Sequence, residues 1–389
     1  MLVARQAEAA ARQLASWYPV VAITGPRQSG KTTLARGVFG HMAYVSLEAP
    51  DNRDFALQDP RGFLSAFPEG AVIDEAQRAP ELFSYLQVRV DETRRTGQFV
   101  LTGSQQFGLL ARISQSLAGR VGLLHLLPFS LSELTAGGYA LGLEALLSGG
   151  QYPPVYDCGV PPHVWYSDYV TTYVERDARQ LVDIRDLDAF RRFVRMCASR
   201  TAQPVNLSAL GADCGVTHNT AKAWLSVLEA SYIAFRLPPH ARNFGKRLVK
   251  TPKLYFYDSG LAAWLTGVES AAQLTHGAMR GALFETWVVS EFVKHRCNRL
   301  LSPNLYFWRD ASGTEVDLIV ERGETLYPLD IKSGQTVAAD WFDSLRQFTA
   351  KSGGPAGCVV FGGEAAQRRG DISVLGWKQI GAALSQAFD

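Results

Sequence analysis

The sequence of 389 residues predicts an α/β protein whose first part is a parallel sheet covered by helices. Short apolar runs alternate with helix-compatible segments through roughly the first third of the chain, which is typical of a parallel sheet buried on both faces. Further along, residues 206–230 have helix-turn-helix spacing, and residues 314–332 predict two strands joined by a tight turn. These patterns predict four regions: a sheet core at 1–128, a helical lid at 129–187, a winged helix-turn-helix at 188–257 and an α/β domain at 258–389.

The composition is that of an ordinary globular protein, with 47% hydrophobic and 20% charged residues. The net charge of +2 is too small to indicate nucleic-acid binding by itself, so that case rests on local basic patches. The five cysteines are widely spaced, which favours reduced thiols in the cytoplasm over a zinc or disulfide framework. The N-terminus is charged and amphipathic rather than a signal peptide, and no stretch has the length of a membrane span. We therefore expect a cytoplasmic chain without a membrane partner.

Residues 25–32 match the complete phosphate-loop pattern G-x-x-x-x-G-K-[ST]. An apolar run at 20–23 precedes them and a helix-compatible segment follows, so a strand and a helix are expected to flank the loop. Backbone N–H groups and the positive end of that helix bind phosphate, while Lys31 would contact the β- and γ-phosphates and the Thr32 hydroxyl would hold Mg²⁺. The sequence thus predicts binding of ATP or GTP by the loop and the next residue: Gly25, Pro26, Arg27, Gln28, Ser29, Gly30, Lys31, Thr32 and Thr33.

Two acidic residues follow the apolar run at 71–73, where ligands bind in open α/β sheets. Asp74 would hold Mg²⁺, directly or through water, and Glu75 would act as general base on the attacking water. The alternative is that the pair is a solvated strand end. Together with a phosphate loop, the pair favours hydrolysis.

Two further polar residues are candidates for this site. Ser104 follows the apolar run at 99–101 and would contact the γ-phosphate or orient the water, or else cap a helix. Arg120 would reach the γ-phosphate of a neighbouring subunit, as arginine fingers do, or else pair with a surface carboxylate.

In this order, the phosphate loop and residues 73–75, 102–104 and 117–120 resemble the motifs of AAA-type P-loop ATPases. The chain is most similar to a group of prokaryotic ATPases with an uncharacterised, nuclease-like C-terminal domain, whose further patterns stand here at 116–120 and 128–134. This resemblance implies ATP as the nucleotide. It also implies hydrolysis that depends on a homo-oligomer, for which a ring is one possible form.

The second helix of the helix-turn-helix begins after Thr217, a suitable N-cap, and would expose His218, Asn219, Lys222 and Ser226. Residues 232–236 and 253–257 would pair as a wing. Between Glu229 and Asp258 the chain has basic but no acidic residues, which suits contact with a phosphate backbone. We expect DNA to be bound through Lys222, Arg242, Lys246, Arg247, Lys250 and Lys253, unless the wing serves protein contacts.

The C-terminal domain carries a second set of charges. Asp330 and Lys332 share one strand face, and Asp317 would lie across the hairpin from Asp330. With a helix carboxylate, either Glu285 or Glu291, these acids suit Mg²⁺, and Lys332 would orient or deprotonate a water. We take Glu285, Asp317 and Asp330 as the metal ligands and Lys332 as the catalytic lysine.

The order Glu, Asp, Asp-x-Lys resembles the PD-(D/E)xK nuclease superfamily over residues 280–362. The resemblance implies a nuclease-like fold, with either an active site or a remnant whose charges pair internally.

Three functions fit these patterns. The first is an ATPase that remodels or translocates along DNA. The second is an ATP-dependent, Mg²⁺-requiring DNA nuclease. The third is an ATP switch that regulates a protein or promoter partner without motor action. A general base at Glu75 favours turnover over mere sensing of ATP.

Overall fold

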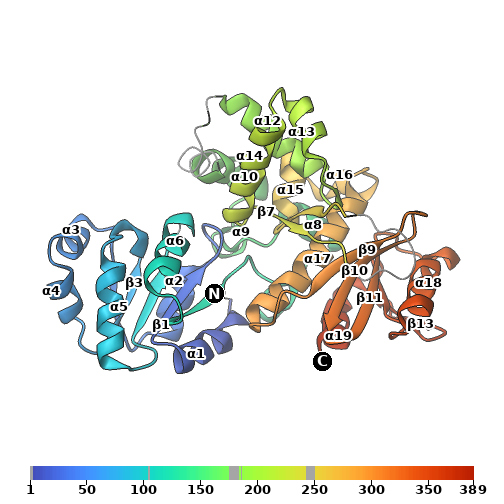
Figure 1. Ribbon diagram of the computed structural model, residues 1–389. Helices are drawn as coiled ribbons and strands as arrows, with labels where there is room; N and C mark the ends of the chain where they lie inside the picture. Colours follow the sequence, from blue (N-terminus) through green and yellow to red (C-terminus); the bar gives the residue numbers. More distant parts are fainter. Residues whose placement is uncertain (1–2, 104–105, 175–183, 185, 242–249) are drawn as a thin grey trace. The chain divides into compact units, whose positions relative to one another are not determined.

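The computed structural model describes residues 3–103, 106–174, 184, 186–241 and 250–389 (Figure 1). Four predicted site residues, Ser104, Arg242, Lys246 and Arg247, lie outside these ranges. The chain divides into two compact units. The first unit contains Met1–Phe129, Ala230–Tyr232 and Arg296–Leu301, and the second contains Ser130–Glu229, Ile233–His295 and Ser302–Asp389.

A five-stranded parallel sheet in the order β2-β3-β4-β1-β5 forms the centre of the first unit. Its strands are β1 (Val20–Thr24), β2 (Ala43–Ser46), β3 (Ala71–Asp74), β4 (Phe99–Thr102) and β5 (Val121–His125). The first four strands confirm the predicted apolar runs. β5 was not among the predicted apolar runs.

Helices cover both faces of this sheet because the strand side chains alternate between two apolar cores. Val21 and Ile23 of β1 pack with the first two helices, whereas Val20 and Ala22 pack with the later ones. The helices are α1 (Ala7–Trp17), α2 (Lys31–Val38), α3 (Pro50–Gln58), α4 (Pro60–Ser65), η1 (Ala76–Arg78), α5 (Leu82–Thr93) and α6 (Gln106–Ser116). The sheet therefore presents its strand ends, rather than its faces, to solvent.

The second unit begins with short helices, as predicted for the region after Pro128. They are α7 (Leu131–Ala136), α8 (Leu143–Gly149), α9 (Pro153–Asp157), α10 (Pro162–Tyr169) and a π-helical turn, η2 (Val170–Val174). Two later helices, α15 (Ser259–Leu265) and α16 (Ala271–Thr275), pack against α8. No helix in the described ranges is long and apolar enough to cross a membrane.

The region predicted as a winged helix-turn-helix contains helices and short strands. They are α12 (Leu187–Ser199), β6 (Gln203–Pro204), α13 (Leu207–Cys214), α14 (His218–Ala230), β7 (Ala234–Leu237) and β8 (Lys253–Phe256). Gly215 ends α13 with a left-handed φ of 73°, and the Thr217 hydroxyl accepts a hydrogen bond from the Thr220 N–H at 3.1 Å. β7 and β8 pair antiparallel, and β6 adds to β8, which gives the sheet order β6-β8-β7.

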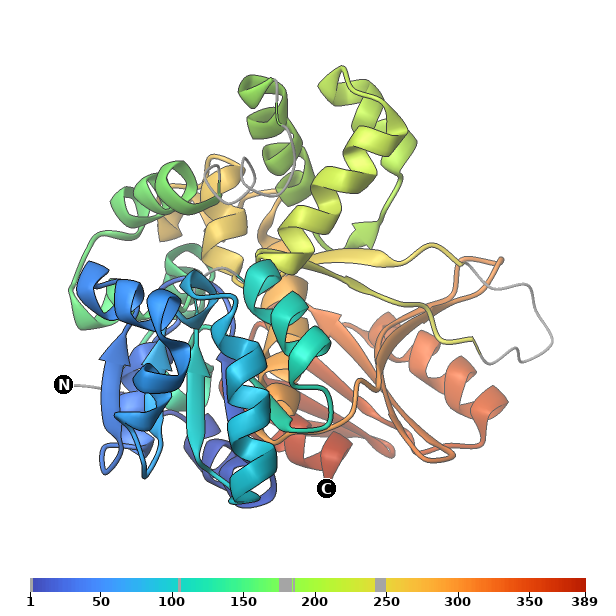
Figure 2. The ribbon, with the colours of Figure 1, turned by 60° about the vertical axis from the view of Figure 1, so that its left-hand side comes forward.

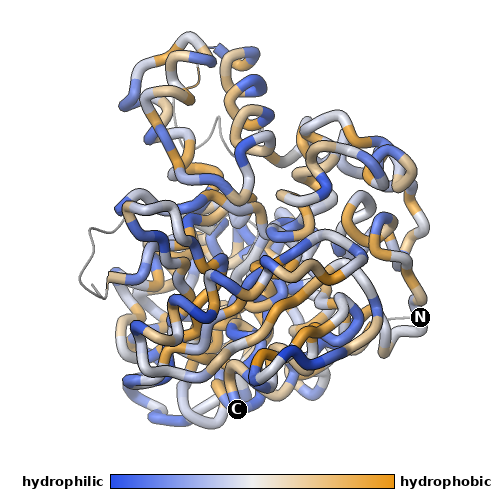
Figure 3. The backbone as a smooth tube through the Cα atoms, turned by 90° about the vertical axis from the view of Figure 1, so that its right-hand side faces the viewer, coloured by the Kyte–Doolittle hydropathy of each residue, from blue (hydrophilic) through white to orange (hydrophobic). Residues whose placement is uncertain are grey.

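A six-stranded mixed sheet, in the order β13-β14-β12-β11-β10-β9, lies in the C-terminal part of the second unit (Figure 2). Its strands are β9 (Leu305–Arg309), β10 (Glu315–Arg322), β11 (Thr325–Lys332), β12 (Cys358–Phe361), β13 (Gln367–Arg369) and β14 (Ile372–Gly376). β10 and β11 form the predicted antiparallel hairpin. In Figure 3 hydrophobic stretches run through the interior of this sheet, and hydrophilic ones lie in the loops around it.

Helices complete the C-terminal domain. They are α17 (Arg280–Asn298), η3 (Ala339–Phe342), α18 (Asp343–Ser352), η4 (Trp377–Gln379) and α19 (Ile380–Phe388). α18 packs against β10 and β11. The order of elements from α17 to β12 is helix, three strands, helix, strand.

Candidate functional site

The phosphate loop lies between β1 and α2, as its sequence predicts. Gly25 has φ 140°, and a Cβ there would come within 2.0 Å of the Leu126 carbonyl oxygen, so only glycine fits. Gly30 caps α2 with φ 90°. The first N–H groups of α2 therefore lie directly after the loop, where they are available to an anion.

Lys31 is buried, and its ammonium donates hydrogen bonds back into the loop. Its Nζ lies 3.0 Å from the Gly25 carbonyl oxygen and 2.6 Å from that of Pro26. The Ser29 hydroxyl is also buried, and it has no hydrogen-bond partner in the part of the chain that the structure describes. A buried cation and a buried hydroxyl in one glycine-containing loop fit a phosphate ligand.

A buried arginine outside the motif braces the loop. Arg5 is only 8% exposed, and its guanidinium donates to the Ser29 carbonyl oxygen at 2.7 Å and to that of Leu127 at 2.6 Å. The guanidinium also lies 4.9 Å from the centre of the Phe129 ring. Arg5 thereby ties the phosphate loop to the segment after β5. Sequence reasoning missed it because no motif includes a residue so far before the loop.

Asp74 at the end of β3 is the acceptor of three hydroxyl groups from neighbouring elements. Thr32 donates to its two carboxylate oxygens at 3.2 and 3.3 Å, and Tyr44 donates at 2.8 Å. Thr102, at the end of β4, donates to the same carboxylate. Parallel strands bring their carboxyl ends to one edge of the sheet, and this explains why Asp74 meets the loop residue Thr32 there.

Tyr44 was not anticipated as part of this site. Tyr44 is 39% exposed, and partial desolvation, followed by its hydrogen bond to Asp74, raises the pKa of its phenol to about 12. The phenol therefore remains protonated at physiological pH and keeps donating to the carboxylate. Tyr44 lies on β2, which pairs with β3 in the sheet, and no motif in the sequence marks this position.

Glu75 follows Asp74 and has a left-handed backbone conformation, with φ 55° and ψ 40°. Its carboxylate accepts a hydrogen bond from Gln77 Nε2 at 2.5 Å and is half-buried. A non-glycine residue held at positive φ costs about 1–3 kcal/mol, and such strain is common at functional sites. The conformation suits a carboxylate that must be held at the strand end.

The residues at this sheet edge fit a bound Mg²⁺ together with nucleotide. Thr32 and Asp74 already share one hydrogen bond, and a hydroxyl and a carboxylate are oxygen ligands of the kind that Mg²⁺ takes beside substrate phosphates. Mg²⁺ in such a site neutralises charge on the phosphate oxygens.

Arg120 lies at the edge of the sheet opposite its own phosphate loop. It precedes β5, which runs parallel to β1, whereas the loop follows the other end of β1. Its guanidinium forms a two-pronged ion pair with Asp91, at 2.6 and 2.8 Å. Arg120 therefore does not act on the nucleotide of its own subunit, and the alternative of a carboxylate partner is observed.

The helix-turn-helix exposes the residues predicted for α14. His218, Asn219, Lys222 and Ser226 are all exposed, and Lys250 is exposed before β8. Arg236 on β7 differs, because it pairs with Glu229 at 2.7 and 2.8 Å. Part of the basic character of the wing is thus neutralised within the unit.

The prediction that Lys253 contacts DNA is wrong. Its side chain is 3% exposed and turns inward from β8, where Nζ lies 2.9 Å from Glu285, 2.5 Å from Glu315 and 3.8 Å from Asp317. Burial acts to lower the pKa of the ammonium, but the surrounding carboxylates outweigh it and raise the pKa above its ordinary value. Lys253 is therefore a buried, charged component of the C-terminal carboxylate cluster.

Asp317 and Asp330 lie near one another, as the hairpin predicts. They stand one step beyond the paired residues Leu318 and Leu329, and Lys332 Nζ is 3.8 Å from an oxygen of each. Ser344 donates to one oxygen of Asp330, while the other is buried without a hydrogen-bond partner among the described residues. Burial, and then Asp317, raise the pKa of Asp330 to about 7.

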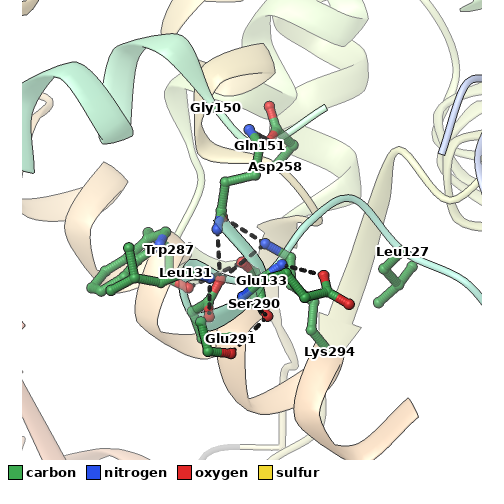
Figure 4. A network of polar contacts seen from close by, with 12 residues as sticks. Leu127, Leu131, Glu133, Gly150, Gln151, Asp258, Trp287, Ser290, Glu291 and Lys294 are labelled. Atoms are coloured by element: carbon green, nitrogen blue, oxygen red, sulfur yellow. Dashed lines mark hydrogen bonds and ion pairs between the residues drawn. The ribbon is translucent and has the colours of Figure 1, made fainter. Parts of the chain in front are cut away.

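The helix carboxylate beside Asp317 is Glu285, not Glu291. Glu285 accepts hydrogen bonds from Lys253 at 2.9 Å and Tyr255 at 2.6 Å, and burial, followed by Asp317, raises the pKa of Glu285 to about 7. Glu291 belongs to a separate buried network, shown in Figure 4, with Gln151 at 2.9 Å and Lys294 at 3.1 Å. One helix thus carries two acids with different surroundings.

The cluster differs from the predicted Mg²⁺ site. Within residues 3–389, leaving aside the ranges not described, no three acidic, histidine or cysteine side chains are grouped so that they could hold a metal ion. The ammonium of Lys253 lies within 4 Å of carboxylate oxygens of Glu285, Glu315 and Asp317, where a metal ion was predicted. The assignment of Glu285, Asp317 and Asp330 as metal ligands is corrected accordingly.

We expect Arg5→Ala to weaken ATP binding by at least ~10-fold, because two buried charge-assisted hydrogen bonds to the backbone around the loop are lost. Titration calorimetry with ATP measures the affinity, and turnover at saturating ATP shows whether chemistry is retained. Arg5→Lys should recover part of the affinity. Arg12→Ala, which removes an exposed arginine that donates to the Val38 carbonyl oxygen at 3.2 Å, is the control. Equal affinity in Arg5→Ala and Arg12→Ala would contradict the role of Arg5.

Three family models match successive parts of the chain. An AAA domain matches residues 18–135, which include β1 to β5 and the residues Lys31, Asp74 and Glu75. Two domains of unknown function, DUF8612 and DUF4143, match residues 141–272 and 280–380. The chain thus contains an ATPase domain of the P-loop AAA type.

The chain is also similar to two mycobacterial proteins. It is 34% identical over 336 residues to the uncharacterized proteins Rv2008c of Mycobacterium tuberculosis and Mb2031c of Mycobacterium bovis, and the match covers 85% of this chain and 74% of each relative.

Two solved structures are similar at lower levels. The Walker-type ATPase PABY2304 of Pyrococcus abyssi is 13% identical with a TM-score of 0.47, covering 68% of this chain and 96% of that one. The RuvB Holliday junction branch migration motor of Thermotoga maritima is 20% identical with a TM-score of 0.29, covering 59% of this chain and 87% of that one.

Proposed function

This chain belongs to the same family as the mycobacterial proteins Rv2008c and Mb2031c, and we propose that it is an ATPase whose hydrolysis cycle acts on DNA. The observation that carries the ATPase part is the meeting of Thr32 and Asp74 at the sheet edge, with Glu75 next to them. That arrangement holds a phosphate loop, a metal-binding carboxylate and a second carboxylate at one place.

At this site each residue would have a distinct task. Lys31 exchanges its two loop carbonyls for phosphate oxygens when nucleotide binds. Thr32 and Asp74 would hold Mg²⁺, and Glu75 accepts the proton of the attacking water. Arg5 keeps the loop in place.

The DNA part of the proposal rests on the elements around α14. The order of helix, strand, two helices and two strands, from α12 to β8, supports a winged helix, and α14 exposes polar and basic groups on one side. Lys250 and the sequence between β7 and β8 add positive charge, which suits binding to a phosphate backbone. In this proposal residues 129–187 form a helical lid.

We propose that the oligomer completes the ATPase site, with Arg120 acting on a neighbour. The pair with Asp91 would then open when subunits assemble. In a mixture of Arg120→Ala and Lys31→Ala subunits, the first kind keeps the phosphate loop and the second kind keeps Arg120. If Arg120 acts in trans, ATPase activity returns at the site that the two kinds share. If Arg120 serves only its ion pair with Asp91, the mixture stays inactive.

The C-terminal domain is proposed to grip DNA. Its order of helix, three strands, helix and strand supports a nuclease-like fold, but the position of Lys253 in the carboxylate cluster does not favour cutting. A switch without turnover is also less favoured, because Glu75 is retained at the strand end next to Asp74.

We expect the variant Lys222→Ala/Lys246→Ala/Arg247→Ala to bind duplex DNA more weakly than the wild type. Each phosphate contact that is lost should reduce the slope of log affinity against log salt by about 1. Fluorescence anisotropy over a range of salt concentrations measures both quantities. Arg95→Ala, which removes an exposed arginine of the first unit that pairs with Glu69, is the control. An unchanged slope in the triple variant would contradict the winged-helix interface.

A further inference from the structure

The carboxylate cluster of the C-terminal domain holds a lysine at the place where the nuclease resemblance expects a metal ion. Its acids come from three elements: Glu285 from α17, Glu315 and Asp317 from β10, and Asp330 from β11. Lys253 enters from β8.

The ammonium of Lys253 makes as many close approaches as it has N–H groups. Its Nζ lies 2.5 Å from Glu315 Oε1, 2.9 Å from Glu285 Oε1 and 3.8 Å from Asp317 Oδ1. An ammonium has three donors; Glu315 and Glu285 lie at hydrogen-bond distance, and Asp317 lies at ion-pair distance. Two of these carboxylates, Glu285 and Asp317, are among the three predicted metal ligands.

The surroundings of Lys253 hold it in place. The residue is 2% exposed, and Nζ lies 5.5 Å from the centre of the Phe307 ring. Tyr255, two residues along β8, donates to Glu285 at 2.6 Å, and Arg309 lies 3.3 Å from Glu315. Glu285 and Glu315 therefore have basic or hydroxyl partners from β8 and β9.

A divalent cation does not fit beside this lysine. Mg²⁺ requires close, nearly octahedral oxygen ligands and keeps several waters, whereas the nearest oxygens here already surround a buried ammonium of like charge. Lys332, at 3.8 Å from both Asp317 and Asp330, adds a second cation to the same cluster.

We infer that Lys253 is a tethered cation that takes the place of the metal ion. The C-terminal domain then has no divalent-metal requirement and no metal-dependent cleavage, and its carboxylates anchor β8, and with it the small sheet β6-β8-β7, to the helix α17 and the strand β10. This assignment goes beyond the proposed ATPase function and does not depend on it.

Removing the lysine should create a metal site. All proteins carry Asp74→Asn, which removes the metal-binding carboxylate of the nucleotide site, and no nucleotide is added. Mn²⁺ is the probe, and bound Mn²⁺ is counted by electron paramagnetic resonance. We expect Lys253→Met to bind one Mn²⁺ with a dissociation constant on the order of 10⁻⁴ M, and at least ~10-fold more tightly than the protein that keeps Lys253. Lys332→Met, the same substitution at the half-exposed lysine, should not gain this site.

Thermal unfolding gives a second readout. Lys253→Met should have a lowered Tm that Mn²⁺ restores, because the three carboxylates lose their shared cation, while Mn²⁺ leaves the Tm of the protein with Lys253 unchanged. If Lys253→Met does not fold, Lys253→Met/Glu315→Gln removes one charge of each sign and is measured in the same way.

Three results would overturn the inference. The first is Mn²⁺ binding by the protein with Lys253 that Asp317→Asn abolishes. The second is a folded lysine variant, single or double, without any gain in Mn²⁺ affinity. The third is an equal gain in Lys332→Met.

Discussion

Lys31→Ala is expected to lower ATP turnover by at least ~100-fold, to the background of the assay. The ammonium is buried in the loop and bound to the carbonyls of Gly25 and Pro26, so it lies within the same turn that would wrap the phosphates. Alanine removes the ammonium that the phosphate-loop pattern supplies to the β- and γ-phosphates. Release of inorganic phosphate at saturating Mg²⁺-ATP measures the effect, and calorimetry shows the accompanying loss of nucleotide affinity.

Lys378→Ala is the matched control, since it removes an exposed lysine whose partner, Glu364, lies in the C-terminal domain. Its turnover should equal that of the wild type. If Lys31→Ala kept wild-type turnover, hydrolysis would have to occur elsewhere, and the phosphate loop would not be the active site.

Glu75→Gln is expected to keep ATP affinity and to reduce turnover by about 10²–10⁴-fold, the range for loss of a general base. The amide has the shape of the carboxylate and retains an oxygen that can accept from Gln77, so the strand end should keep its conformation. What it lacks is the capacity to take a proton from water. Single-turnover hydrolysis and ATP titration separate the two effects.

Glu81→Gln provides the comparison, because Glu81 is an exposed acid just before α5. It should turn over ATP normally. Full activity in Glu75→Gln would remove Glu75 from the role of general base and would leave the switch alternative open.

Local sequence patterns predicted the elements that depend on near neighbours in the chain. The four apolar strands, the phosphate loop between a strand and a helix, the two helices at 207–214 and 218–230 and the β10–β11 hairpin all carry their own periodicity or turn residues, and these elements are present as expected. The position of Asp74 beside the phosphate loop was also predicted, because the carboxyl ends of parallel strands lie at one edge of the sheet.

Residues whose roles depend on distant contacts were missed or misassigned. Arg5 contacts Ser29 across 24 positions, and Tyr44 contacts Asp74 across 30, and neither belongs to a motif. Lys253 was grouped with the basic wing because its neighbours in sequence are basic. Its position on β8 turns its side chain inward to acids on α17 and β10.

The choice between Glu285 and Glu291 also depends on contacts with residues that are distant in the sequence. Both acids lie on α17 and both are buried or nearly so, and the sequence placed Glu291 on the more central apolar stripe. Only the packing of the helix separates them. Glu285 meets β8 and β10, while Glu291 accepts from the Leu131 N–H at 3.0 Å and from Gln151.

The central claim is that the site of Lys31, Asp74 and Glu75 hydrolyses ATP for work on DNA. Steady-state phosphate release by the wild-type chain and by Lys31→Ala, each with and without duplex DNA, tests this claim most directly. The account predicts turnover by the wild type that rises when DNA is added, and none by Lys31→Ala in either condition. Wild-type turnover that DNA leaves unchanged, at concentrations where DNA is bound, would contradict it.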